Sequence, residues 1–215
     1  MLVRFVRRAL LALLLIPTFA AAQAPAGPAP VEGEDYQLIE NGTPYAATKG
    51  RIEVVEVFGY VCPHCARFEP RFTEWAAKQP KDVQVVRLAA PWGGHWQPYA
   101  RAFYAAEALG VLGKTHDAVF RALHQDGSLP LRNATATEIA SFYAGYGVNP
   151  ERLIAAMEGD AVEAAMARAQ AFMLRSGIEA TPTVVVAGKY RITARSPQDV
   201  LRVADHLIAR ERARR

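Results

Sequence analysis

Long apolar runs are almost absent from this sequence, and the one that is present lies at the start of the chain. Residues 9–16 (ALLALLLI) form this run, and Pro17 ends it well short of the roughly 20 apolar residues that a membrane-spanning helix needs. No later stretch is long and apolar enough to cross a bilayer. We therefore expect the body of the chain to be soluble.

The apolar run belongs to a segment with the pattern of a secretory signal peptide. Three arginines precede it, at positions 4, 7 and 8, and the small residues Ala20, Ala21 and Ala22 follow it. We expect cleavage after Ala22, which makes residues 1–22 the signal peptide; the alternative is an uncleaved membrane anchor. A cleaved signal would deliver residues 23–215 out of the cytoplasm.

Net charge is also small once this segment is set aside. The full sequence has a formal net charge of +4, and residues 1–22 contain three arginines and no acidic residue, so the remainder has a net charge of +1. A nucleic-acid-binding protein should have a basic face. The only basic cluster is at the C-terminus, namely Arg210, Arg212, Arg214 and Arg215. We interpret it as a solvated helix end and expect no nucleic-acid partner.

Cysteine is scarce as well, and the only two cysteines lie close together in YVCPHCAR, residues 60–67. A structural disulfide is a poor explanation, because its effect grows with the length of the loop it closes. A metal site is a second alternative, but no further C-x-x-C and no spaced His pair completes a tetrahedral set with Cys62 and Cys65. We therefore expect no metal and no cofactor. Haem attachment requires His where Ala66 stands, so redox chemistry remains.

The flanking sequence predicts a strand before the cysteines and a helix after them. Residues 51–58 (RIEVVEVF) are dense in Val and Ile and lie between two glycines, which is typical of a buried strand. From Pro63 the apolar residues follow helical spacing, and we expect Pro70 to kink this helix rather than end it. Residues 83–88 (VQVVRL) predict a second strand and hence a parallel β-α-β unit.

The rest of the sequence predicts a helical block and then a return to the sheet. Four segments are mostly Ala-rich and helical, namely residues 97–110, 114–124, 137–145 and 150–176. Residues 183–187 and 190–193 predict a short hairpin. Ser196 and Pro197 begin a terminal helix that runs through about Arg210. Residues 23–34 are rich in Pro, Ala and Gly, and we expect them to be a disordered lead-in.

The position of Cys62 at the start of the predicted helix indicates a reactive thiol. Unpaired backbone N–H groups and the positive end of the helix dipole favour an anion there. Pro63 fits the first helical turn, and His64 adds a donor, or a positive charge when protonated, within reach of the sulfur. Each effect lowers the pKa of Cys62. Cys65 lies one turn further on the apolar face, so its thiol should be buried and titrate at higher pH.

This difference in acidity predicts a disulfide exchange at Cys62. In the oxidised protein a substrate thiolate attacks Cys62 and forms a mixed disulfide, with Cys65 as the leaving group. A second substrate thiol then displaces Cys62, which leaves easily because its thiolate is stabilised. The net result is a disulfide donated to the substrate.

At this point the residues resemble a known family. The C-P-H-C motif at a strand-to-helix junction, a later Thr181-Pro182, and helices between two halves of a sheet are similar to the DsbA family of periplasmic disulfide oxidases. The resemblance spans roughly residues 35–215. It implies an α/β protein with a thioredoxin-like fold and an inserted helical subdomain, in which residues 35–94 and 177–215 form the thioredoxin-like domain and residues 95–176 the insert.

The resemblance also implies roles outside the C-P-H-C motif. It implies a cis peptide bond at Thr181-Pro182 that helps to bind extended substrate, although trans is the commoner state of any X-Pro bond. It matches Glu56 with a buried acid that handles the proton of the inner cysteine. Glu56 shares a strand face with Val54 and Phe58, so we expect a partly desolvated carboxylate with a raised pKa. The alternative is a strand edge open to water.

The family pattern implies a monomeric periplasmic thiol oxidase of unfolded or folding secreted proteins. The partner that reoxidises it would be an inner-membrane, quinone-linked protein of the DsbB type. A disulfide isomerase or reductase is the second hypothesis, although residues 23–50 are too few for the dimerisation module of an isomerase. A non-redox chaperone or metal-binding module is the third.

Residues 91–96 (PWGGHW) allow two interpretations: Trp92, His95 and Trp96 present apolar surface to substrates, or they pack inside the protein.

Overall fold

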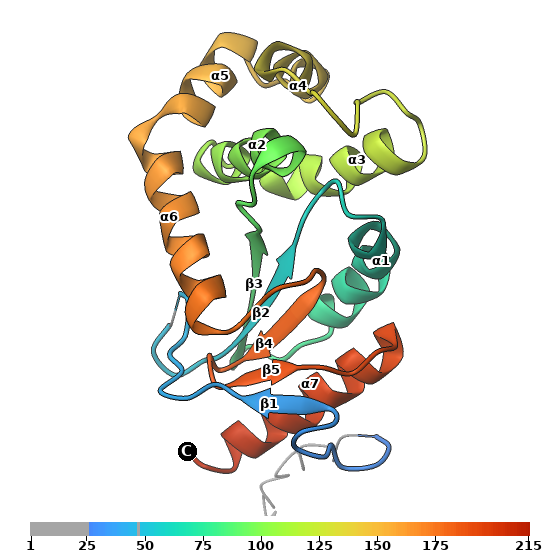
Figure 1. Ribbon diagram of the computed structural model, residues 1–215, viewed down its shortest axis with the longest axis vertical. Helices are drawn as coiled ribbons and strands as arrows, with labels where there is room; N and C mark the ends of the chain where they lie inside the picture. Colours follow the sequence, from blue (N-terminus) through green and yellow to red (C-terminus); the bar gives the residue numbers. More distant parts are fainter. Residues whose placement is uncertain (1–25, 47) are drawn as a thin grey trace, which may run out of the picture.

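A computed structural model describes residues 26–46 and 48–215 (Figure 1). The predicted signal peptide, its cleavage site and the first three residues of the lead-in lie outside the described residues. Within residues 26–46 and 48–215, no helix combines the length and the apolar character needed to cross a membrane.

Five strands form one sheet in the order β1-β5-β4-β2-β3. Their bounds are Tyr36–Leu38 for β1, Ile52–Phe58 for β2, Val83–Ala89 for β3, Thr183–Val186 for β4 and Tyr190–Ile192 for β5. β2 and β3 run parallel, in a register that pairs Glu56 with Arg87, and β4 runs antiparallel to β2. The predicted β-α-β unit is confirmed, and so is the predicted hairpin, which is formed by β4 and β5.

The sequence analysis did not predict β1. This strand has only three residues, and its Leu38 is 56% exposed. Its partner is β5, with Tyr36 opposite Ile192 at the far end of the chain. A segment this short has no alternation of apolar and polar residues, so only the pairing with a distant strand defines it.

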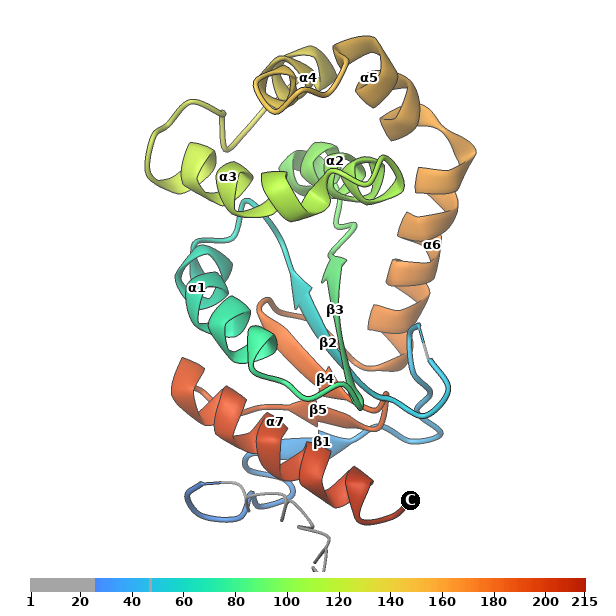
Figure 2. The same ribbon diagram turned by 180° about the vertical axis from the view of Figure 1, so that it is seen from behind.

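Helices cover both faces of the sheet. α1 (Pro63–Ala77) and α7 (Pro197–Arg212) lie on one face, and α6 (Asp160–Arg175) lies on the other (Figures 1 and 2). Every residue of β2 is buried. Its side chains divide between two cores: Val54 belongs to a cluster with residues of α1 and α7, and Val55 to a cluster with residues of the helical block. Burial on both faces explains why this strand is apolar without interruption.

Most of the helical block lies beyond one end of the sheet, and its last helix, α6, runs back along the second face (Figure 1). It comprises α2 (Gln97–Ala108), α3 (Leu112–His124), α4 (Ala136–Ala144), α5 (Pro150–Glu158) and α6. The prediction of one continuous helical segment over residues 150–176 is wrong, because Gly159 has an extended backbone (φ −79°, ψ 155°) and separates α5 from α6. Glycine has a low helix propensity, and the acidic residues Asp160 and Glu163 favour a new helix N-terminus directly after it.

The two helices on the first face begin as predicted. α1 begins at Pro63 and continues past Pro70 without interruption. α7 begins at Pro197, where the Ser196 hydroxyl accepts a hydrogen bond from the backbone N–H of Asp199 (3.0 Å). Each start combines a capping side chain with proline in the first turn, and both features are local in the sequence.

Residues 26–34, part of the predicted lead-in, contact α7. Arg202 of α7 donates a hydrogen bond to the carbonyl oxygen of Pro28 (2.5 Å). Within the segment's own turn, the backbone N–H of Val31 donates to the Asp35 carboxylate (2.9 Å). Pro30 is buried. In the structure this part of the chain therefore follows the helix surface.

The segment between β3 and α2 packs against the turn that precedes the cysteines. The rings of Trp92 and Trp96 meet edge to face with centroids 4.8 Å apart, and both pack on the core that includes the helical block. The six-membered ring of Trp96 lies against Gly59, where an added Cβ would overlap it. Trp92 and Trp96 are thus partly buried against the core, and the contact of Trp96 with Gly59 favours a packing role for its ring.

Gly59→Ala should destabilise the protein, because the added methyl group would displace Trp96 from its packed position. Overpacking of this kind costs about 1–3 kcal/mol in the free energy of unfolding. Urea unfolding followed by tryptophan fluorescence measures the loss. Gly113→Ala in α3 is the control, since nothing lies within 4 Å of a Cβ added there and alanine should be neutral or slightly stabilising. Equal destabilisation by the two changes would contradict this account.

Candidate active site

The turn between β2 and α1 is held by α3. The backbone N–H of Cys62 donates to the Gly59 carbonyl oxygen (3.0 Å) and closes the turn. His124 donates from Nε2 to the carbonyl oxygen of Tyr60 (2.7 Å), and the Tyr60 hydroxyl bonds Nδ1 of His116 (2.8 Å). Because a carbonyl oxygen only accepts, the Nε2 atom of His124 must carry a hydrogen. Sequence reasoning missed both histidines, since they lie 64 and 56 residues from Tyr60.

Cys62 is the N-cap residue of α1, as predicted. Its backbone is extended (φ −84°, ψ 118°), and its sulfur accepts a hydrogen bond from the backbone N–H of Cys65 (3.4 Å). Pro63 follows in the first turn of the helix. The sulfur thus satisfies one of the helix's unpaired N–H donors, in the way that a Ser or Asp oxygen does at other helices. The side chain of Cys62 is 6% exposed, whereas that of Cys65 is fully buried.

The two thiols differ strongly in acidity. The pKa of Cys62 is lowered to about 5, chiefly by the hydrogen bond from the Cys65 thiol. Burial opposes this shift, while the Thr181 side chain and the backbone N–H groups of Cys65 and His64 add to it. Burial raises the pKa of Cys65 well above its ordinary value, and the bond to Cys62 raises it further. At neutral pH Cys62 is therefore the thiolate and Cys65 the thiol, which agrees with the predicted asymmetry.

The loop before β4 approaches the cysteines from the other side. The Thr181-Pro182 peptide bond is cis, as the resemblance implies. The carbonyl oxygen of Thr181 lies 3.5 Å from the Cys62 sulfur and accepts from its thiol form. The Thr181 side chain instead stabilises the thiolate. Residues 119 positions apart in the sequence thus meet at the reactive sulfur.

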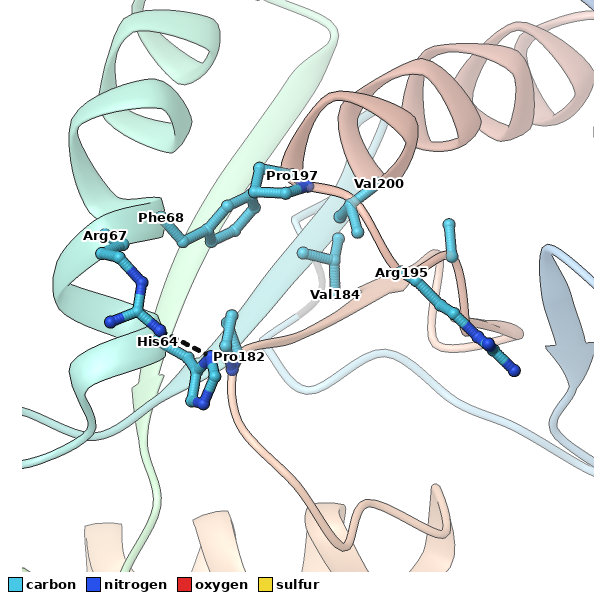
Figure 3. A pocket seen from close by; sticks show the side chains of 9 residues that line it. His64, Arg67, Phe68, Pro182, Val184, Arg195, Pro197 and Val200 are labelled. Atoms are coloured by element: carbon cyan, nitrogen blue, oxygen red, sulfur yellow. Dashed lines mark hydrogen bonds between the residues drawn. The ribbon is translucent and has the colours of Figure 1, made fainter.

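The ring of His64 is directed toward Arg67 (Figure 3). Arg67 donates to Nδ1 of His64 (2.9 Å), and both side chains are exposed. In this pair Nδ1 of His64 is the accepting ring nitrogen, because a guanidinium only donates. Among the described residues the ring has no hydrogen bond to Cys62, and the contribution of His64 to the thiolate comes from its backbone N–H. Sequence reasoning missed Arg67, which is the cation at this position.

Glu56 is fully buried in the middle of β2. Neither of its carboxylate oxygens has a hydrogen-bond partner among the described residues, and Nε of Arg87 lies 3.6 Å away. Burial raises the pKa of Glu56 well above its ordinary value, and the nearby charge of Glu69 raises it further, while Arg87 opposes both. The expectation of a desolvated acid with a raised pKa is confirmed, and the alternative of a strand edge open to water is wrong. Its part in proton transfer stays a prediction.

The partners of Glu56 extend into a buried polar network between α1, β3 and α3. Glu69 accepts hydrogen bonds from Arg87 (2.6 Å) and Thr73 (2.5 Å), and its carboxylate lies 3.3 Å from Nε2 of His116. Burial favours protonation of Glu69, but His116, Arg87 and Thr73 outweigh it and hold the pKa of this carboxyl below its ordinary value. Glu69 is therefore the more acidic carboxyl of the network and Glu56 the less acidic one.

Part of this network has the spacing of a metal site. Glu69, His116 and Asp117 each place a donor atom within 4.8 Å of the others. Glu69 is already bonded to Arg87 and Thr73, however, and the Arg87 guanidinium would repel a cation bound beside it. The charges around these residues therefore do not favour a metal ion. The expected absence of a metal stays a prediction.

A stabilised thiolate and a buried partner thiol, at the start of a helix that packs on a mixed sheet, define a thioredoxin-like dithiol protein. The family model described as thioredoxin matches residues 42–206. The thiol:disulfide interchange protein DsbA of Pseudomonas aeruginosa is 39% identical over 184 residues, which are 84% of this chain and 85% of that protein. DsbA of Azotobacter vinelandii is 40% identical and covers 84% of each chain.

Solved structures agree with these sequence relatives. The crystal structure of the oxidoreductase DsbA from Xylella fastidiosa matches with a TM-score of 0.84 and 48% identity, over 86% of this chain and 98% of that one. The chain belongs to the DsbA family. The predicted family and the predicted thioredoxin-like fold with an inserted helical subdomain are both confirmed.

Glu56→Gln should stabilise the protein at neutral pH, because it removes a carboxylate that is buried without a hydrogen-bond partner. The folded pKa of Glu56 lies above the unfolded value of about 4.3, and each unit of difference destabilises the ionised protein by about 1.4 kcal/mol. This penalty is absent below the unfolded pKa, grows as pH rises and is complete above the folded pKa. Urea unfolding from pH 4 to 8 measures the free energy of unfolding of both proteins. The value for the variant minus that for the wild type should increase as pH rises.

Glu53→Gln, on the same strand, is the matched control. Both carboxylate oxygens of Glu53 accept backbone hydrogen bonds, from Tyr45 (2.7 Å) and Ala46 (2.5 Å). An amide nitrogen cannot accept, so this variant should be less stable than the wild type at neutral pH. A Glu56→Gln variant that is destabilised in the same way would show that the attraction between Glu56 and Arg87 outweighs the cost of burying the carboxylate.

Proposed function

We propose that this chain is a thiol:disulfide oxidase that donates the Cys62-Cys65 disulfide to newly secreted proteins. The observation on which this rests is the opposite shift of the two thiols: the pKa of Cys62 is lowered to about 5, while burial raises that of Cys65. A dithiol with one stabilised thiolate favours its reduced form, so its disulfide is readily given away.

The exchange has two balanced steps. A substrate thiolate attacks the Cys62 sulfur, an S–S bond forms between substrate and Cys62, and the Cys62-Cys65 bond breaks with its electron pair on Cys65. A second substrate thiolate then attacks the substrate sulfur of the mixed disulfide, and Cys62 leaves as a thiolate. The substrate loses two electrons to the enzyme and gains one disulfide.

The neighbouring residues have distinct roles in this proposal. Cys65 needs a proton when it leaves, because its thiol is the stable form in its buried position. Glu56 has a raised pKa and lies on the strand that leads into the active-site turn, and we assign it this proton transfer. Pro63 and the backbone of His64 position and stabilise the Cys62 thiolate. Thr181, whose carbonyl oxygen lies 3.5 Å from the sulfur, and Pro182, which follows it, would bind the main chain of an extended substrate.

The proposed setting is the periplasm, reached through the signal peptide expected at residues 1–22. The relatives are named as thiol:disulfide interchange proteins, which supports protein substrates with free thiols. An oxidase is reduced by each turnover, so it needs an electron acceptor. We propose an inner-membrane, quinone-linked protein of the DsbB type for this step, with the enzyme acting as a monomer.

Cys65→Ala should trap substrates on Cys62 as mixed disulfides, because the internal thiol that reverses the bond is missing. Cells producing the variant should contain complexes that are visible on non-reducing gels and disappear on reduction. Cys62→Ala is the control and should trap nothing, since the buried Cys65 is inaccessible to substrate. Equal capture by both variants would refute the assignment of Cys62 as the attacked sulfur.

The reduced protein should be more stable than the oxidised protein at pH 7. The folded pKa of Cys62, about 5, lies below the unfolded value of about 8.5, so folding favours the thiolate. This stabilisation is complete above pH 8.5 and is lost as pH falls through 5. At pH 7 it amounts to about 3 kcal/mol, at roughly 1.4 kcal/mol for each pH unit above the folded pKa. The disulfide form has no thiolate to stabilise.

Urea unfolding of both redox forms between pH 4 and 8 measures this difference. We expect the advantage of the reduced form to grow with pH across this range. If the oxidised form is the more stable at pH 7, the protein does not readily donate its disulfide. That result would favour the reductase hypothesis over the oxidase hypothesis.

A further inference from the structure

One face of α3 is matched to Tyr60, which precedes Cys62 by two residues. Three side chains of α3 contact this tyrosine, at positions 116, 120 and 124, which share a helix face because they are four residues apart. His116 bonds the hydroxyl group (2.8 Å), Phe120 packs edge to face on the ring with centroids 5.0 Å apart, and His124 donates to the carbonyl oxygen (2.7 Å). One stripe of α3 therefore holds one residue of the active-site turn.

The carbonyl oxygen of Tyr60 depends on His124. Tyr60 is only 1% exposed, and among the described residues its carbonyl oxygen accepts no hydrogen bond other than the one from Nε2 of His124. A buried carbonyl group without a partner is unfavourable, because it has given up its bonds to water and gained none in return. Without the His124 donor the turn would therefore move until this oxygen met water or another donor.

The orientation of this carbonyl group determines where Cys62 lies. A peptide group is planar, so a hydrogen bond to its oxygen fixes the orientation of the whole peptide between Tyr60 and Val61. Val61 alone separates that peptide from Cys62. The bond from the backbone N–H of Cys62 to the Gly59 carbonyl oxygen joins two residues of the same turn and moves with it. The bond to His124 thus anchors the backbone of the turn to the helical block.

The Cys62 sulfur is sensitive to a movement of the turn. The Cys65 thiol is the main donor that stabilises its thiolate, and the backbone N–H groups of Cys65 and His64 contribute as well. These donors belong to the first turn of α1, whereas the sulfur belongs to the N-cap residue, at which the chain enters the helix. Hydrogen bonds weaken steeply when their geometry departs from the optimum, so a shift of the N-cap residue relative to α1 destabilises the thiolate.

We propose that His124 is a positioning residue of the redox site: by holding the carbonyl group of Tyr60, it keeps the Cys62 sulfur against the donors of α1. The inference rests on the proposed oxidase function and adds a residue of the helical block to it. The reactivity of Cys62 then depends on the last residue of α3. His116 and Phe120 contact the side chain of Tyr60, so they stabilise the packing of α3 and leave the backbone of the turn to His124.

Three substitutions of His124 in the full mature chain test the role of this hydrogen bond. His124→Phe keeps an aromatic ring and removes the donor. His124→Gln keeps a donor, because the amide nitrogen of glutamine lies about as far along the side chain as Nε2 of histidine. His124→Asn has the same amide one methylene group shorter, which leaves it out of reach. The measurements are the thiolate absorbance of Cys62 against pH in the reduced protein and the equilibrium of each protein with glutathione.

His124→Phe and His124→Asn should raise the pKa of Cys62 from about 5 by about 0.3 to 1. They should also shift the equilibrium with glutathione roughly twofold to tenfold toward the protein disulfide, since a less stabilised thiolate favours the reduced form less. His124→Gln should stay close to the wild type in both measurements. If His124→Phe does not fold, His124→Asn against His124→Gln gives the same comparison.

Tyr60→Phe is the control for a purely structural role of the contact with α3. It removes the hydroxyl group that bonds His116 and leaves the carbonyl group bonded to His124. It should lower the urea concentration at which the protein unfolds, while the pKa of Cys62 and the equilibrium with glutathione stay as in the wild type. His206→Phe in α7 is the control for replacing a half-buried histidine elsewhere, and it should leave both redox measurements unchanged.

Wild-type values in both His124→Phe and His124→Asn would overturn the proposal. Equal shifts in His124→Phe and Tyr60→Phe would do the same, because the effect would then come from a general loosening of α3, and so would a His124→Gln variant shifted as far as His124→Phe. A wild-type protein that fails to oxidise the thiols of a reduced peptide would instead overturn the oxidase function itself, whatever the His124 variants show.

Discussion

The hydrogen bonds that the Cys62 sulfur accepts at the start of α1 are the feature on which the rest of the site depends. The bond from the Cys65 thiol contributes most to lowering the pKa of Cys62 to about 5, and the backbone N–H groups of Cys65 and His64, which need acceptors at a helix N-terminus, lower it further. A sulfur in this position is stabilised as a thiolate, whereas the disulfide form has no negative charge for these hydrogen bonds to stabilise. The local structure of one helix start thereby determines the direction in which electrons flow.

The remainder of the fold positions that helix start and isolates the second thiol. β2, buried on both faces, ends at the turn, and His124 of α3 holds the carbonyl of Tyr60 within it. The loop of Thr181 encloses the sulfur from the opposite side. The helical block covers Cys65, so that the two thiols differ in burial although they are only one helical turn apart. Cys62 is thus the acidic thiol of the pair, and Cys65 is the inaccessible one.

The burial of Glu56 reduces the stability of the protein. A carboxyl that is fully buried and has no hydrogen-bond partner among the described residues is unfavourable for stability, and the adjacent charge of Glu69 makes its ionisation more so. His116 and Arg87 hold the pKa of Glu69 below its ordinary value, so the network combines one acid that ionises readily with one that resists ionisation. Groups that reduce stability in this way are found where a protein needs a proton held out of water.

The sequence by itself determined the features that depend on neighbours along the chain. Residues 51–58 predicted β2, Pro63 predicted the start of α1 with Cys62 as its cap, and Ser196 with Pro197 predicted the start of α7, because periodicity and capping are local. The quoted motifs were also sufficient to predict the family and its fold.

Only the tertiary structure decided what brings distant residues together. The three-residue β1 exists because it pairs with β5, and His116 and His124 act on a turn more than 50 residues away. The ring of His64 bonds Arg67 rather than the sulfur. Contacts of this kind depend on how the elements pack in space, and no local pattern in the sequence encodes them.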